Sequence, residues 1–132
     1  MSLIDSALLC AFIDVESSFN RNAFLNDRNG GSTGLTQIDL PTAQWAGYAG
    51  TAQGLANPQV NILWFVKILR NLAADLTAHD KFSLRNLAAA YNAGLGHVLG
   101  GGTDPAYEDK IIEAYTFFAT ALECDIPPVT VE

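Results

Sequence analysis

The sequence predicts a compact, mainly α-helical domain. Apolar residues recur at helical spacing along most of the 132 residues, and helix start and stop signals bracket these segments. No segment alternates polar and apolar residues with the period of two that is typical of strands. Hydrophobic residues make up 49% and charged residues 16% of the chain, which excludes a disordered or coiled-coil protein. We expect one domain over residues 1–124 and a C-terminal tail over residues 125–132, which contains Pro127 and Pro128.

The first predicted helix ends near residue 17. Ser2 is its predicted N-cap, and Glu16 lies at its C-terminal end, one position past the apolar face. That face consists of Ile4, Leu8, Ala11 and Val15. Residues 20–34 follow as a predicted long loop rich in Asn and Gly, and structureless loops of this length are often functional.

Four further helices follow from capping and stop signals. Asparagine or serine before a helix accepts hydrogen bonds from its first N–H groups, and proline fits the first helical position. A short helix is predicted from about Pro41, with Asp39 near its start and Gly47 past its end. A long core helix follows from Asn57 and Pro58 to His79, and a further helix from Ser83 to Gly94. The last helix is predicted from Pro105, after the turn Gly100–Gly102.

The charge pattern excludes several classes of function. The net charge of −7 and the absence of a basic patch argue against a nucleic-acid binder. Residues 104–132 hold half of the acidic residues with Lys110 as their single base, which predicts a solvated acidic face and tail. No apolar run is long enough to span a membrane, and no leader segment is visible. His79 and His97 are not part of a cluster with metal-ligand spacing, so we expect neither a metal nor a cofactor.

Glu16 is the first candidate for chemistry. A carboxyl at a helix end beside a polar loop can lie at the floor of a cleft, where partial desolvation raises its pKa so that it can donate a proton near neutral pH. On position alone, a solvated helix-end glutamate is the alternative.

Three ordered motifs resemble those of the superfamily of soluble lytic transglycosylases and goose-type lysozymes. They are Glu16-Ser17-Ser18-Phe19-Asn20, Gly34-Leu35-Thr36-Gln37-Ile38 and Ala90-Tyr91-Asn92-Ala93-Gly94. Asn57-Pro58 with Asn61 also fits the transglycosylase pattern, whereas Thr36 stands where the family commonly has methionine. The resemblance covers about residues 8–118 and implies a lysozyme-like helical domain with a substrate cleft.

The resemblance also implies roles for individual residues. Glu16 matches the catalytic acid, Ser17 or Ser18 would hold the substrate or Glu16, and Gly34 would let the backbone approach the substrate. Gln37 would bind an N-acetyl sugar, and Tyr91 and Asn92 would line the site beside Glu16. As structural alternatives, Tyr91 is a half-buried core residue and Asn92 a helix C-cap.

Two aspartates make the goose-type branch the preferred interpretation. In that branch, aspartates near Asp27 and Asp39 are proposed to position the attacking water, and Asp39 aligns more securely because it follows Gln37 by two residues. Its alternative role is to cap the helix that follows. The segment Gly102-Thr103-Asp104-Pro105-Ala106-Tyr107, which opens the last helix, also resembles this branch.

The resemblance implies an enzyme that cleaves the β-1,4 bond between N-acetylmuramic acid and N-acetylglucosamine, with peptidoglycan strands as its partner at the cell wall. Hydrolysis of the goose type is the preferred interpretation, and a monomer is expected. The alternatives are a lytic transglycosylase that forms 1,6-anhydro products, a chitinase, and a non-catalytic glycan-binding protein. A lone domain also suggests, by association, a phage lysis or tail enzyme or a secreted bacterial enzyme.

Four further side chains carry weaker expectations. Trp45 and Tyr48 could stack on a sugar ring, although core packing is favoured for Trp45. Cys10 and Cys124 are interpreted as buried free thiols rather than a disulfide that closes the chain.

Overall fold

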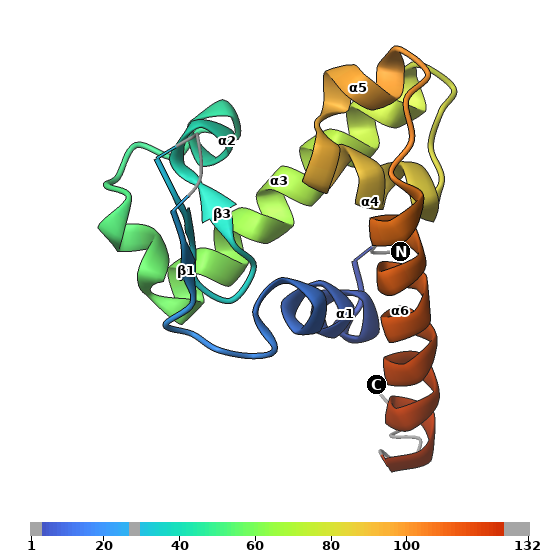
Figure 1. Cartoon of the computed structure of the whole chain (residues 1–132), viewed down its shortest axis with the longest axis horizontal. Coiled ribbons are helices and arrows are strands. Elements are labelled where there is room, and N and C mark those ends of the chain that lie inside the picture. The colour runs from blue at the N-terminus through green and yellow to red at the C-terminus, as the bar shows by residue number, and fades with distance from the viewer. Residues whose placement is uncertain (1–3, 27–29, 126–132) are drawn as a thin grey trace, which may run out of the picture.

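The computed structural model describes residues 4–26 and 30–125, with the side chains of residues 123–125 excepted. The mainly helical fold is confirmed (Figure 1). The elements in chain order are α1 (Ser6–Ser17), β1 (Phe24–Leu25), β2 (Ser32–Thr33), β3 (Ile38–Asp39), α2 (Leu40–Trp45), the 3₁₀ helix η1 (Gln53–Ala56), α3 (Pro58–Ala78), α4 (Leu84–Ala93), α5 (Leu95–Leu99) and α6 (Pro105–Asp125). The division of the chain at residue 124 stays a prediction, because residues 126–132 lie outside the described part.

The helix starts follow the capping signals in the sequence. Asn57 accepts hydrogen bonds from the first N–H groups of α3, and Ser83 accepts one from Asn86 N at 3.0 Å. Helix α1 differs from the prediction, because its N-cap is Asp5, whose Oδ1 accepts from Leu8 N at 2.8 Å. The predicted cap, Ser2, lies outside the described residues.

Five short elements of the described part were not predicted, namely three strands and two short helices. The strands β1, β2 and β3 form an antiparallel sheet in that order, with Phe24 opposite Thr33 and Thr33 opposite Ile38. Each strand has two residues, which is too short for an alternating pattern to be recognised. Helix α5 begins directly after Gly94, where the sequence indicated a stop, and η1 precedes α3.

The hydrophobic core surrounds α3, which runs through the middle of the molecule (Figure 1). Phe65, Leu69 and Leu76 of α3 are fully buried, which confirms that this helix forms the core. Phe12 of α1 packs edge-on against Phe65, with ring centroids 5.1 Å apart. The sheet, α2 and η1 lie towards one end of α3, and α4 and α5 lie towards the other.

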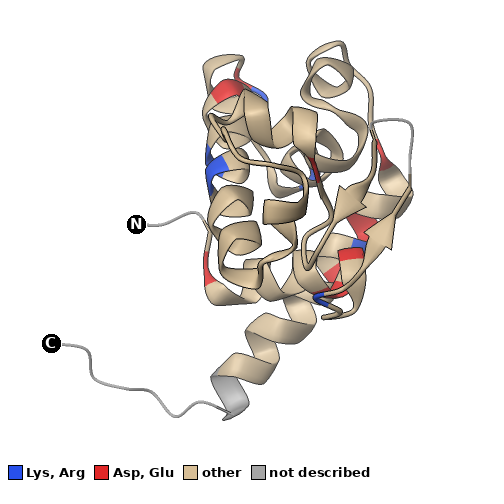
Figure 2. Cartoon of the chain, turned by 90° about the vertical axis from the view of Figure 1, so that its left-hand side faces the viewer, with Lys and Arg blue, Asp and Glu red and all other residues tan. Residues whose placement is uncertain are grey.

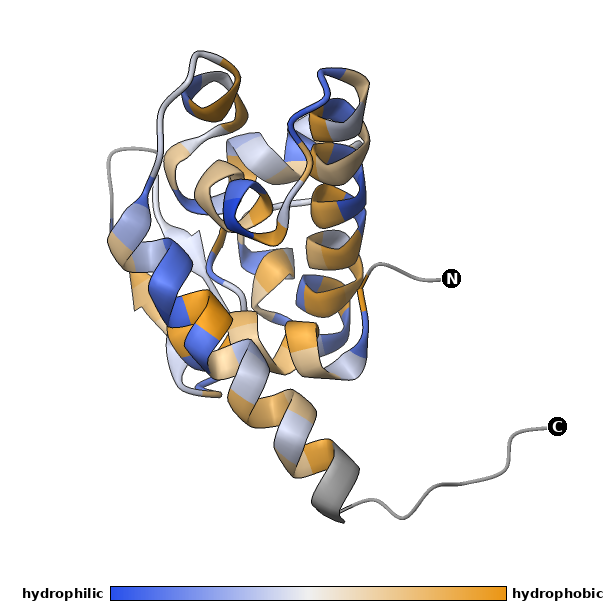
Figure 3. Ribbon diagram, turned by 90° about the vertical axis from the view of Figure 1, so that its right-hand side faces the viewer, coloured by the Kyte–Doolittle hydropathy of each residue, from blue (hydrophilic) through white to orange (hydrophobic). Residues whose placement is uncertain are grey.

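Helices α1 and α6 lie against each other although they come from opposite ends of the chain (Figure 1). Ala11 and Ile111 are fully buried, from α1 and α6 respectively. The C-terminal part of α6 extends beyond the other helices, where its ribbon carries both apolar and polar residues (Figure 3). The buried residues of the described part of α6, which are Tyr107, Glu108, Ile111 and Ala114, lie in its first half, and Phe118 of the second half packs against Phe19.

Charged residues are scattered over the face seen in Figure 2, where Lys and Arg form short separate segments between uncharged ribbon. This distribution offers no continuous basic stripe for a nucleic-acid backbone on that face. Within the described ranges, no helix combines the length and the apolar character needed to cross a membrane.

Candidate active site

The carboxyl group of Glu16 lies near the end of α1, half-buried between α1, α4 and α6. Its Oε2 accepts a hydrogen bond from the hydroxyl of Tyr107, which comes from the first turn of α6. Ser18 ends α1 in the left-handed conformation with φ 52°, and Phe19 follows with φ 62°. This sharp turn directs the chain away from the helix immediately after Glu16.

Burial is the main influence on the protonation of Glu16. It raises the pKa of the Glu16 carboxyl to about 7, and the hydrogen bond from Tyr107 opposes this by stabilising the charged form. A carboxyl with this pKa is partly protonated at neutral pH and can act as either acid or base. The environment expected from the position of Glu16 is therefore present, and the solvated alternative is not.

Tyr91 lies near Glu16 and is hydrogen-bonded to the segment that contains Thr36. Its hydroxyl donates to the carbonyl of Thr36 at 2.6 Å, and its ring packs edge-on against Phe12 and Phe65. Burial raises the pKa of Tyr91 well above its usual value, and the charges of Glu16 and Asp39 act in the same direction. Tyr91 thus lies near both carboxyl groups and combines the core role with the lining role.

The loop between β2 and β3 is fixed by side chains of the first two motifs. The hydroxyl of Ser17 lies 2.7 Å from the carbonyl oxygen of Leu35, and the side-chain Nε2 of Gln37 donates to the carbonyls of Ala23 and Gly34 at 3.1 and 3.0 Å. Gln37 itself has φ 54°. Ser17 and Gln37 therefore hold the sheet and its loops against the end of α1.

The buried side chain of Asn61, on α3, holds this segment by hydrogen bonds. Its Nδ2 donates to the carbonyls of Thr33 and Leu55, both at 2.8 Å, and its Oδ1 accepts from the N–H and the hydroxyl of Thr36. Gly34, with φ 80°, leaves room for the amide, because a Cβ there would lie 2.5 Å from Asn61 Nδ2. The polar Thr36 thus has a partner, which accounts for its presence where the resemblance leads one to expect methionine.

A cavity of about 400 Å³ lies between α2 and α4. Asp39, Thr42, Trp45, Tyr91 and Asn92 are among its lining residues. The expectation that Trp45 packs in the core is wrong, because 48% of its surface is exposed and its ring borders this cavity. Tyr48 instead packs edge-on against Trp64 and donates to the carbonyl of Thr51.

The other candidate residues lie in different settings. Asp39 caps α2, since its Oδ1 accepts from Thr42 N at 2.8 Å. Asn92 is exposed at the end of α4 and donates to Asp104 Oδ2 at 2.7 Å. Ser18 is exposed at the end of α1, and Asp27 lies outside the described residues.

Tyr107 is the site residue that the sequence reasoning missed. From the sequence, it was named only as part of the segment that opens the last helix and resembles the goose-type branch. Tyr107 is buried, with 9% of its surface exposed. Its hydroxyl reaches Glu16, so one side chain belongs to both the core and the site. Its place beside Asp104 and Pro105, in a segment already linked to the resemblance, is the signal that could have identified it.

Among the described residues, no group of three His, Cys, Asp or Glu side chains could hold a metal ion. Cys10 carries a half-buried free thiol, and burial raises its pKa. The side chain of Cys124 lies outside the described part, so the interpretation of the pair stays a prediction.

The helical fold around a half-buried glutamate, with a small sheet beside it, defines a lysozyme-like domain. Residues 1–110 match the model of the transglycosylase SLT domain, and the chain belongs to this family. It is therefore an enzyme domain of the lytic transglycosylase or muramidase type.

A solved structure shares the fold. It is the X-ray structure of an inactive glutamate-to-glutamine mutant of the lytic transglycosylase Slt from Pseudomonas aeruginosa, with a TM-score of 0.73 and 20% sequence identity. The match covers 98% of this chain but 23% of the Pseudomonas chain, so this domain corresponds to a part of that protein. No curated protein sequence matches the chain.

Proposed function

We propose that this domain is a lytic transglycosylase that cleaves the β-1,4 bond between N-acetylmuramic acid and N-acetylglucosamine in peptidoglycan. The observation that carries the proposal is the half-buried Glu16 carboxyl, which accepts a hydrogen bond from Tyr107 and whose pKa burial raises to about 7. The match to the transglycosylase SLT domain favours this reaction over the goose-type hydrolysis that the sequence favoured.

In the first step, Glu16 donates a proton to the glycosidic oxygen while the bond from that oxygen to C1 of the muramoyl residue breaks. The leaving sugar gains a hydroxyl, and an oxocarbenium-like centre develops at C1. Because Tyr107 donates to Oε2 of Glu16, we assign the transferred proton to the other oxygen, Oε1.

In the second step, the Glu16 carboxylate accepts the proton of the muramoyl 6-hydroxyl. The oxygen of that hydroxyl bonds to C1 and closes a 1,6-anhydro ring, so the reaction consumes no water. One group with a pKa near 7 serves both steps, since it is available in both protonation states at neutral pH.

The setting of Asp39 supports this choice. A hydrolase that inverts configuration needs a second carboxylate to activate water on the face opposite the acid. The Oδ1 of Asp39 instead accepts the Thr42 N–H at the start of α2. We therefore assign Asp39 to fold and cleft shape rather than to water activation.

We assign the glycan strand to the cavity between α2 and α4. Tyr91 lines this cavity, and the charge of Glu16, which is not among the lining residues, acts on the Tyr91 hydroxyl. Trp45 offers an exposed aromatic face for a sugar ring, and Asn92 an amide for its hydroxyls. The Nε2 of Gln37 already donates to two carbonyls, so we assign its amide oxygen to an acetamido N–H.

The test is digestion of purified peptidoglycan, with mass spectrometry of the products and Glu16→Gln as the inactive control. We expect products that are lighter by one water than those with reducing ends, and unchanged product type for Asp39→Asn, because asparagine also caps helices well. Reducing-end products that disappear in Asp39→Asn would establish hydrolysis instead. Binding without any product would establish a glycan-binding protein, and cleavage of chitin oligomers alone would establish a chitinase.

A further inference from the structure

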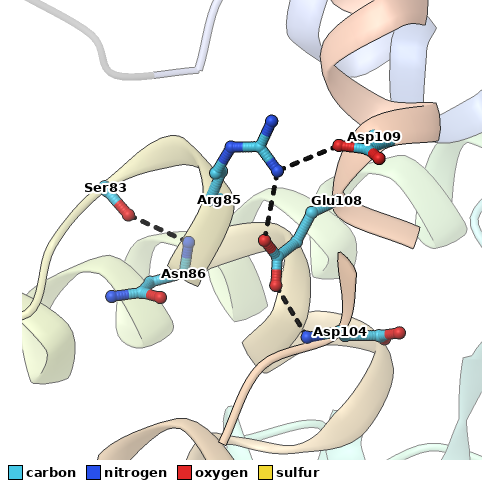
Figure 4. Close-up of polar contacts among 6 residues, drawn as sticks. All are labelled: Ser83, Arg85, Asn86, Asp104, Glu108 and Asp109. Atoms are coloured by element: carbon cyan, nitrogen blue, oxygen red, sulfur yellow. Dashed lines mark hydrogen bonds and ion pairs between the residues drawn. The ribbon is translucent and has the colours of Figure 1, made fainter. Parts of the chain in front are cut away.

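Glu108 is a buried acidic residue outside the site described above. With 5% of its surface exposed, it is one of three buried polar or charged residues in the described ranges, beside Thr36 and Asn61. Both of its carboxylate oxygens have partners (Figure 4): Oε2 accepts from Asp104 N at 2.7 Å, and Oε1 faces Arg85 Nη1 at 3.4 Å. An acidic side chain this buried is costly unless its partners are held in place.

Arg85 connects this carboxylate to α4. The same Nη1 atom lies 3.0 Å from Asp109 Oδ1, so Arg85 bridges two acidic residues of α6 (Figure 4). The two acids differ in environment, since 6% of the Glu108 side chain and 67% of the Asp109 side chain are exposed. The exposed pair contributes little because water screens it, which makes Asp109 a matched control for Glu108.

The first turn of α6 also bears two contacts to the proposed active site. Asp104, whose N–H is held by Glu108, accepts a hydrogen bond from the Asn92 amide at 2.7 Å. Tyr107, the residue before Glu108, donates to Glu16 on α1. The position of this turn therefore sets where the Tyr107 hydroxyl meets the carboxyl group.

We propose that Glu108 is a positioning residue, which fixes the first turn of α6 against α4 so that Tyr107 holds the carboxyl of Glu16. This inference rests on the proposed function of Glu16. It assigns to Glu108 no contact with the substrate.

The pKa of Glu16, which the experiment below measures, depends on the groups around its carboxyl. Tyr107 faces it from α6 and Tyr91 from α4, and the charge of Asp39 acts on Tyr91 from the sheet side. The Tyr107 hydrogen bond lowers the pKa of Glu16 against the larger effect of burial. If the first turn of α6 shifts so that this bond weakens while the Glu16 carboxyl stays buried, the pKa of Glu16 rises above about 7.

The experiment is an NMR titration of the Glu16 side-chain carboxyl, combined with kcat and KM on peptidoglycan fragments. We expect Glu108→Ala to raise the pKa of Glu16 and to lower kcat about tenfold with little change in KM, since misplacement of a catalytic group acts on the chemical step. Glu108→Gln keeps an oxygen that can accept from Asp104 N–H, and we expect it to restore most of both values. Asp109→Ala, the matched control, should leave both unchanged.

Arg85→Ala is the second variant in case Glu108→Ala does not fold. We expect a smaller change in the same direction, because the side chain of Arg85 is 52% exposed and anchors Glu108 from one side only. Folded variants at Glu108 and Arg85 that titrate Glu16 as the parent does would overturn the proposal. The titration needs no catalysis, so it separates this result from a failure of the proposed function, which retained activity in Glu16→Gln would reveal.

Discussion

The hydroxyl of Tyr107 donates a hydrogen bond to the carboxyl of Glu16, although 91 positions separate the two residues in the chain. Burial raises the pKa of Glu16, and this bond moderates the rise. The two influences oppose each other, so the pKa near 7 depends on α1 and α6 together. The predictions below test this balance and the supports around it.

The rate of cleavage should fall as the pH rises above about 7, because the proton that Glu16 donates is then lost. Replacing Tyr107 by Phe removes the bond that favours the charged form, so the falling limb should move to higher pH. Profiles of kcat/KM against pH for both proteins check this. A limb at the same pH in Tyr107→Phe would show that the bond has no influence on Glu16.

Glu16→Gln should lower cleavage about a hundredfold or more, since an amide cannot donate the proton, while circular dichroism stays unchanged. It should also alter the pH dependence of stability. The pKa of Glu16 is raised from 4.5 to about 7 in the folded state, so this group favours folding below pH 4.5 and loses that contribution as the pH rises through 7.

The expected loss is about 3 kcal/mol by pH 8. The melting temperature of Glu16→Gln relative to the parent should therefore increase between pH 4.5 and 8. Parallel curves for the two proteins over this range would contradict the raised pKa.

Asn61→Ala should lower the free energy of unfolding by about 3 kcal/mol, because it leaves the buried Thr36 hydroxyl and the carbonyls of Thr33 and Leu55 without their partner. Asn71→Ala, at an exposed position on the same helix, is the matched control and should change it by less than about 0.5 kcal/mol. Urea denaturation measures both. Equal effects would mean that water replaces the lost bonds of Asn61.

Gly34→Ala should destabilise the fold by about 2 kcal/mol and reduce cleavage. An alanine is strained at the φ of 80° that this position has, and its Cβ would meet the Asn61 amide. Gly96→Ala is its control, because it lies within α5 with no atom within 4 Å of the added Cβ. That change should leave stability equal or higher. Thermal unfolding and activity assays on both variants separate backbone strain from a general effect of alanine.

Trp45→Ala should raise KM for glycan fragments about tenfold, because it removes the exposed ring beside the cavity while the core stays intact. The melting temperature should change little. Quenching of tryptophan fluorescence by a glycan in the parent, but not in this variant, would locate the sugar at Trp45. An unchanged KM would remove Trp45 from the binding site.

Much of the fold could be predicted from local signals. Asn57, Ser83 and Pro105 mark helix starts because caps act within one turn, and the position of Glu16 at a helix end follows from the same periodicity. The sheet could not be predicted, because strands of two residues carry no pattern and owe their pairing to contacts such as those of Asn61 and Gln37. Tyr107 was missed for a related reason, since its place beside Asp104 and Pro105 does not show that its hydroxyl meets a carboxyl 91 positions away.

The packing of α1 against α6 has a consequence for the order of events during synthesis. Glu16 leaves the ribosome long before Tyr107, so a nascent chain has its acid in water, with an ordinary pKa, until the last helix emerges and docks. Glu16 therefore acquires its raised pKa only once the segment that carries Tyr107 has emerged. Under the proposed function, chains that stop before Tyr107 lack the acid that the reaction needs at neutral pH.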